Sequence, residues 1–226
     1  MCERLNEAIR FASDCHAGQV RKFGGTPYIL HPLEVAAVIG TITNDEDTLI
    51  AGLLHDTVED CDVDPALIKE KFGARVAALV QSETEDNRSD RPPEETWKQR
   101  KEESLLMLEN TKDLGVKIMW LGDKLSNIRS FHREFDKEGN AVWLHLHQKD
   151  PAMQQWYYET IAEDAEHINE VEEKAALMGY VRLMRRTIRR GGSETEEGRR
   201  TVATTKRKYL LCSIRSTDRP FKEDKP

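Results

Sequence analysis

The amino-acid sequence predicts an all-α protein. Apolar residues recur three and four positions apart in successive stretches, which is the spacing of helices that bury one face. Capping residues, prolines and glycines separate these stretches, and we find no internal repeat and no convincing series of strands. The 226 residues suffice for one domain with a substantial core, followed by a tail.

The first helix is expected over 3–16, and Gly18 ends it. Residues 19–28 follow as a loop that is rich in glycine and proline, residues that suit turns. The buried face of this helix is predicted to carry Leu5, Ala8, Ile9, Ala12 and Cys15.

His31 and Pro32 begin the second helix, with the proline in the first turn, where its missing N–H costs nothing. A third helix is predicted over 46–59, capped by Asn44 or Asp45. Its middle is apolar on nearly all sides, so we expect a buried central helix.

The remaining boundaries follow from the same signals. Asp64-Pro65 begins a helix that Gly73 stops, and Ala74 begins the next. The polar stretch 83–95 is expected to be an exposed loop that could lie over a site. The later segments are a helix over 97–110, a second buried helix over 116–130, a turn at 136–140 and a long helix or helix pair over 152–178.

Composition favours a soluble protein of a reducing compartment. Charged residues make up 33% and aromatic residues 7% of the chain. No apolar run approaches the roughly 20 residues that a membrane helix needs, and the N-terminus lacks the pattern of a signal peptide. The 4 cysteines form no CxxC pair and are expected as free thiols. We therefore expect a cytoplasmic protein without a membrane partner.

Charge is distributed unevenly along the chain. From Val181 onward there are 14 Lys and Arg against 6 Asp and Glu, whereas the preceding residues carry 20 against 35. We therefore expect a domain over 1–180 and a basic polar tail over 181–226. An acidic body is not typical of a nucleic-acid-binding domain, and no nucleic acid is required by this composition. The tail could touch RNA or an acidic partner, but a solvated end is the simpler interpretation. The oligomeric state stays open.

The most informative residues are His55 and Asp56, which stand in an apolar helical run. Buried His and Asp are costly unless they are paired or bind a metal. Residues four apart share a helix face, so His55 aligns with Glu59 and Asp56 with Asp60. An ordinary helix end would favour Lys or Arg over these acidic residues. Mixed imidazole and carboxylate ligands suit Mn, Fe or Zn, and the set predicts a metal-dependent phosphohydrolase.

Other candidates are ambiguous when each is taken alone. His31 could be a core histidine, and Asp123 could be the partner in a buried ion pair. Asp123 and Asn127 share a helix face, so Asn127 places an amide beside a possible metal ligand. Arg21 and Lys22 lie in the glycine-bearing loop and could hold phosphates, although a solvated pair is the simpler interpretation of the dipeptide. Arg100-Lys101 has the same ambiguity.

The order of these motifs resembles the HD-domain hydrolase of the RelA/SpoT alarmone family, and in particular its small stand-alone members. The resemblance covers roughly residues 1–178. It rests on His16-Ala17-Gly18-Gln19-Val20-Arg21-Lys22, Pro27-Tyr28-Ile29-Leu30-His31-Pro32, Val35-Ala36, Leu53-Leu54-His55-Asp56-Thr57-Val58-Glu59-Asp60, Phe72-Gly73 and Asp123-Lys124-Leu125-Ser126-Asn127.

The resemblance implies an all-helical HD-domain bundle that removes the 3′-pyrophosphate from guanosine tetra- or pentaphosphate. It implies one divalent metal, usually Mn²⁺, and an acidic pair that orients or deprotonates the attacking water. It also implies cations for the substrate and a polar contact to the nucleoside. Carried onto this sequence, the metal ligands are His31, His55, Asp56 and Asp123, the acidic pair is Glu59 and Asp60, and the substrate-binding residues are Arg21, Lys22 and Asn127.

Two departures and two alternatives accompany this expectation. Asn87 stands where relatives often carry a loop lysine, and Arg88 could serve instead. The residues after about Val181 match nothing in the family. The first alternative is an HD-domain phosphohydrolase of another nucleotide, such as a dNTP or NADPH. The second is a non-catalytic HD module that binds a nucleotide or a partner.

Overall fold

The computed structural model describes residues 2–86, 88 and 90–165. In this part of the chain the regular structure is helical, without a β-strand, and an isolated antiparallel bridge joins Val20 and Pro27. The all-α fold predicted from the sequence is therefore confirmed. In chain order the elements are α1 (Cys2–Cys15), α2 (Leu30–Ile39), α3 (Glu46–Leu54), α4 (Thr57–Asp60), α5 (Pro65–Phe72), α6 (Ala74–Glu83), α7 (Pro93–Asn110), α8 (Leu114–Glu138), the 3-10 helix η1 (Gly139–His145) and α9 (Pro151–Ala165).

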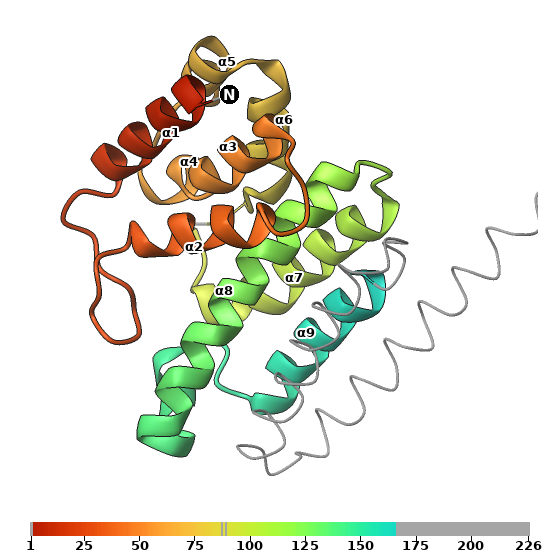
Figure 1. Ribbon diagram of the computed structural model, residues 1–226. Helices are drawn as coiled ribbons and strands as arrows, with labels where there is room; N and C mark the ends of the chain where they lie inside the picture. The colour runs from red at the N-terminus through yellow and green to blue at the C-terminus, as the bar shows by residue number, and fades with distance from the viewer. Residues whose placement is uncertain (1, 87, 89, 166–226) are drawn as a thin grey trace, which may run out of the picture.

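Helix α3 is the centre of the bundle and packs against α1, α2, α6 and α8 (Figure 1). Every residue of α3 from Ile50 to Leu54 is buried, as its apolar sequence predicts. The long helix α8 crosses the molecule; it packs on α2, α3 and α6 over one part of its length and contacts η1 near its C-terminal end (Figure 1). Helix α9 lies beside α7 and α8.

Two glycines allow α2 to approach its neighbours closely. A Cβ atom at Gly52 of α3 would lie 2.3 Å from Cδ1 of Ile39 in α2, and a Cβ atom at Gly122 of α8 would lie 3.0 Å from Cγ1 of the same isoleucine. Gly52 lies three residues before His55, and Gly122 directly precedes Asp123. The small residues thus bring together the three elements that carry the expected metal ligands.

The predicted third helix is interrupted, and this part of the prediction is wrong. Helix α3 ends at Leu54, and α4 begins at Thr57, with His55 and Asp56 in a turn between them. The Thr57 hydroxyl donates to the Leu54 carbonyl at 2.7 Å, so a side chain occupies an acceptor that a continuing helix would use. The cap prediction holds for Asp45, whose carboxylate accepts from the Thr48 N–H at 3.1 Å.

The expected exposed loop over 83–95 is shorter than predicted and begins in a buried place. Glu83 ends α6 and is buried, and the Glu85 side chain is only 10% exposed because it pairs with cations of α7. At the other end, α7 already begins at Pro93, since a proline suits a first turn and the following Glu94 and Glu95 favour a helix N-terminus.

The predicted end of the second buried helix is also wrong. Helix α8 continues to Glu138 and stops at Gly139, which has a φ of 58°, so residues 136–138 are helical rather than part of a turn. An ion pair one turn apart supports this polar end, between Lys137 and Glu134 at 3.1 Å.

Three expectations lie partly or wholly outside the described residues. Helix α9 confirms the beginning of the helix expected over 152–178, and its described part ends at Ala165. The boundary at 180 and the tail over 181–226 are outside the described ranges, as is Asn87. Within those ranges, no helix is both long enough and apolar enough to span a bilayer.

Candidate metal centre and substrate cavity

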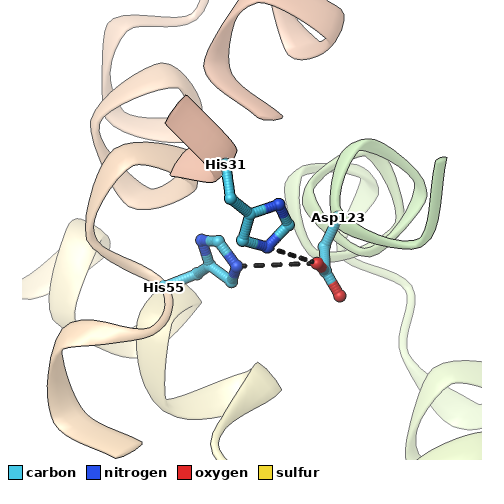
Figure 2. A group of neighbouring side chains, drawn as sticks. All are labelled: His31, His55 and Asp123. Carbon is cyan, nitrogen blue, oxygen red and sulfur yellow. Dashed lines mark ion pairs between the residues drawn. The ribbon is translucent and has the colours of Figure 1, made fainter. Parts of the chain in front are cut away.

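Four side chains from three parts of the fold converge on one point. His31 comes from the first turn of α2, His55 and Asp56 from the turn after α3, and Asp123 from the middle of α8. Figure 2 shows both imidazoles directed at the Asp123 carboxylate. The Nε2 atoms of His31 and His55 lie 3.0 and 3.6 Å from Asp123 Oδ1. They lie 3.4 and 2.9 Å from Asp56 Oδ2.

Outer contacts hold both imidazoles with Nε2 toward this centre. The Nδ1–H of His55 donates to the Gly52 carbonyl at 2.9 Å. The Nδ1–H of His31 donates to Ser126 Oγ at 2.9 Å, and the Ser126 hydroxyl donates to Glu34 at 2.7 Å. Partners of this kind fix the tautomer of a metal-binding histidine and leave a lone pair on Nε2.

The donor set fits a divalent cation. The Nε2 atom of His55 is buried and has no hydrogen-bond partner, although carboxylate oxygens face it. Two nitrogen lone pairs and two carboxylate oxygens that meet at one point repel each other unless a positive charge lies between them. Burial opposes protonation of His55, but the nearby Asp56 and Asp123 raise its pKa well above the usual range, which indicates the same need. His31, His55 and Asp123 form a group close enough to hold an ion, and mixed N and O ligands suit Mn, Fe or Zn.

The carboxylates of this centre are held ionised. Burial alone would raise the pKa of Asp123, but Lys124 and the two imidazoles lower it well below the usual range. The Lys124 ammonium contacts Asp123 and lies 3.0 Å from Glu83 Oε1. The Asn127 amide donates to Asp123 Oδ1 at 2.6 Å, and the Tyr28 hydroxyl donates to Asp56 Oδ2 at 2.8 Å. Both acids can therefore serve as anionic ligands.

The centre lies in a polar cavity of about 210 Å³, and Glu59 and Asp60 of α4 line this cavity as well. Burial raises the pKa of Glu59, and the carboxylates of Glu85 and Asp56 raise it further. A carboxylate whose pKa is shifted toward neutrality is better suited to accept a proton from water.

A larger cavity of about 610 Å³ adjoins the polar one. Arg21, Lys22 and Asn127 line it, and Arg21 donates to Asn127 Oδ1 at 2.9 Å. Its aromatic lining residues are Phe23, Tyr28, Trp97, Phe131, Trp143, Tyr157 and Tyr158. Both cavities share Tyr28, Asp60, Lys101, Lys124 and Asn127. A lining that combines cations with aromatic rings suits a phosphorylated ligand that carries a flat ring.

A hydrogen-bonded link connects the Arg21-Lys22 loop to the acidic pair. Gln19 Nε2 donates to the main-chain carbonyl of Asp60 at 3.0 Å, and the buried His16 donates from Nδ1 to Gln19 Oε1 at 2.8 Å. The ring of His16 also stacks on Tyr28, with centroids 4.8 Å apart. These contacts therefore attach the loop that carries Arg21 and Lys22 to helix α4, which carries the acidic pair.

The structure brings every predicted site residue to one of the two cavities. It does not bring Arg88 there, because the Arg88 guanidinium pairs with Glu103 at 2.7 Å. The sequence by itself assigns no site role to Gln19, Tyr28 or Ser126, although all three stand inside the quoted motifs, and it leaves Arg100-Lys101 as an ambiguous cation pair. No local signal marks Glu83 or Glu85.

Fold and site together define a helical protein with a buried histidine and carboxylate centre beside a cationic, aromatic cavity. The model of the HD domain matches residues 8–153, which is more than half of the chain, and the protein belongs to this family.

Curated relatives and solved structures agree with this membership. The chain is 31% identical to guanosine-3′,5′-bis(diphosphate) 3′-pyrophosphohydrolase of Aquifex aeolicus, over 94% of this chain and 29% of that protein. It is 35% identical to the protein of the same name in Vibrio cholerae, over 57% of this chain and 18% of that protein. The chain thus spans less than a third of the length of these relatives.

Two solved structures share the fold. A metazoan ortholog of SpoT, described as hydrolysing ppGpp, has a TM-score of 0.65 at 22% identity, over 81% of this chain and 96% of that one. A protein of Listeria monocytogenes EGD-e has a TM-score of 0.61 at 31% identity, over 70% of this chain and 99% of that one.

Proposed function

We propose that this protein is a metal-dependent hydrolase that removes the 3′-pyrophosphate from guanosine 3′,5′-bis(diphosphate) and its pentaphosphate analogue. One observation carries the proposal: the buried His/Asp centre opens directly into a cavity lined by cations and aromatic rings, with residues common to both. The activity named for the Aquifex and Vibrio relatives supports the choice of substrate.

His31, His55, Asp56 and Asp123 would hold the metal, for which we propose Mn²⁺. When bound, such a cation lowers the pKa of a water molecule and polarises a phosphoryl oxygen. Lys124, Asn127 and Tyr28 keep the two aspartates oriented and charged. Ser126 and the Gly52 carbonyl orient the two imidazoles and fix their tautomer.

Glu59 and Asp60 would orient the attacking water and accept its proton. The water oxygen forms a bond to the phosphorus that carries the 3′ oxygen, and the bond between that phosphorus and the 3′ oxygen breaks. The 3′ oxygen takes up a proton and becomes a hydroxyl, while pyrophosphate leaves. Arg21 and Lys22 would bind phosphate oxygens, and Asn127, fixed by Arg21, would contact the nucleoside.

We further propose that the hydrolase domain lies within 1–180, that 181–226 form a basic tail, and that the protein acts in the cytoplasm. A nucleotide substrate and the free thiols of Cys15 and Cys61 support the location.

The test is product analysis after incubation of the full chain with Mn²⁺ and a panel of ppGpp, pppGpp, NADPH and dNTPs. Release of pyrophosphate from the first two supports the proposal. Release of phosphate from NADPH or of triphosphate from dNTPs alone assigns a different nucleotide to the same centre. A folded, metal-loaded protein that binds ppGpp and hydrolyses none of the panel would instead be a non-catalytic HD module.

A further inference from the structure

Lys101 of α7, half of a cation pair that the sequence leaves ambiguous, stands at the junction of the two cavities. Its side chain lines both cavities and is 17% exposed. The ammonium lies 2.6 Å from Glu85 Oε1 and 5.1 Å from the centroid of the Tyr157 ring. It is also near enough to the acidic pair to lower the pKa of Glu59 against the effect of burial.

Among the cations that line the cavities, Arg21 and Lys22 line only the larger one and Arg100 only the polar one. Lys124 lies between Asp123 and Glu83 and belongs to the metal centre. Arg88 pairs with Glu103 and lines neither cavity. Lys101 therefore combines access to both cavities with a partner that is not a metal ligand.

That partner, Glu85, has more than one donor. Arg100 Nη1 lies 2.8 Å from Glu85 Oε2, and the Ser104 hydroxyl donates to Glu85 Oε1 at 3.1 Å. If Lys101 turned to another anion, Glu85 would keep two donors and would not be left as a bare buried charge, which would be costly. The arrangement permits Lys101 to exchange one anionic partner for another.

We propose that Lys101 binds the pyrophosphate group of the substrate, and that Glu85 is the counter-ion from which it is released. A lysine ammonium is a mobile point charge that suits phosphate oxygens. The scissile bond joins the pyrophosphate, at the metal centre, to the 3′ oxygen of a nucleoside in the larger cavity, so a cation at the junction of the cavities lies beside the phosphoryl group that is attacked. The substrate in this inference rests on the proposed function, whereas the anion-binding role of Lys101 does not.

The experiment measures binding of inorganic pyrophosphate to the full chain loaded with Mn²⁺ by titration calorimetry. A hydrogen bond to a charged group is worth roughly 1.5–3 kcal/mol, so Lys101→Met should weaken binding about tenfold or more. Lys98→Met, which removes an exposed lysine from the same helix, should leave the affinity unchanged. Lys101→Arg should retain part of the affinity.

Glu85→Gln separates a binding role from a structural one. If Glu85 competes with pyrophosphate for Lys101, this variant should bind pyrophosphate a few-fold more tightly. If Lys101 and Glu85 merely hold α7 in place, both variants should weaken binding alike, and that result overturns the proposal. Should Lys101→Met fail to fold, the signs of the Glu85→Gln and Lys101→Arg effects still decide.

Kinetics with ppGpp distinguish this inference from the proposed function. If the wild-type protein hydrolyses ppGpp and Lys101→Met shows the same KM, the role of Lys101 is contradicted and the proposed function is not. If the wild-type protein binds pyrophosphate through Lys101 but does not hydrolyse ppGpp, the proposed substrate is contradicted and the role of Lys101 is not.

Discussion

The Nδ1 atom of His31 lies 2.9 Å from the hydroxyl oxygen of Ser126, a residue 95 positions later in the chain. The Ser126 hydroxyl in turn donates a hydrogen bond to Glu34, 2.7 Å away. This chain of two hydrogen bonds sets the tautomer of His31 and directs Nε2 at the expected metal position. The first prediction tests its effect on metal binding.

Ser126→Ala should weaken Mn²⁺ binding by about 10- to 100-fold, because loss of such an outer partner costs a metal site roughly that factor. Titration of the metal-free protein with Mn²⁺, followed by the paramagnetic signal of the free ion, gives the affinity. Ser130→Ala, at a buried position one turn further along α8, is the matched control. Equal affinities in wild type and Ser126→Ala would contradict the role assigned to this serine.

The double substitution Glu59→Gln and Asp60→Asn should reduce hydrolysis of ppGpp by about 100-fold or more, the range expected for loss of a general base. Metal content, measured by elemental analysis, should not change, because both residues line the cavity without contacting the imidazoles. Glu70→Gln, at an exposed position of α5, controls for lost charge. Loss of metal together with activity would show that the acidic pair belongs to the ligand set.

Gln19→Leu should break the link between the Arg21-Lys22 loop and the main chain of Asp60. The free energy of unfolding should fall by about 1–3 kcal/mol, since the Asp60 carbonyl loses a donor and the buried His16 Nδ1 keeps only the weaker contact with Cys61 Sγ at 3.3 Å. We expect kcat to fall and the Mn²⁺ affinity to persist, because Gln19 touches the acidic pair and no metal ligand. If the variant has a normal kcat and reduced stability, Gln19 stabilises the fold and does not contribute to catalysis.

Glu83 should make the metal-free protein less stable as pH rises from about 4.5 to 7. Burial raises the pKa of Glu83 from 4.5 to about 7, even though Lys124 opposes the shift. Within this window the folded state holds a proton that the unfolded state has lost, so its contribution to stability declines with rising pH. Urea unfolding with a chelator present, at several pH values, should show this decline relative to Glu83→Gln. Parallel stability curves for the two proteins would contradict the shifted pKa.

Much of the fold follows from local sequence patterns. The apolar period of 3–16, the Asp45 and Asp64 caps and the buried run of α3 all occur where the sequence predicts them. The interruption after Leu54 was not predictable from the apolar period, because it depends on which donor takes the Leu54 carbonyl. The sequence predicts a loop at Pro92 and Pro93, whereas Pro93 is the first residue of α7, because a proline suits a loop and a first helical turn equally well.

The sequence by itself determined which chemical groups are available and how they are spaced along the chain, and this was enough to predict the fold class and to select candidate ligands. Only the tertiary structure decided how those groups meet. The closeness of α2, α3 and α8 depends on Gly52 and Gly122 facing Ile39, and the orientation of His31 depends on Ser126. The places of Glu83, Glu85 and Lys101 likewise depend on packing between distant segments. Burial, charge pairing and the freedom of Nε2 arise from such contacts, and no local period in the chain encodes them.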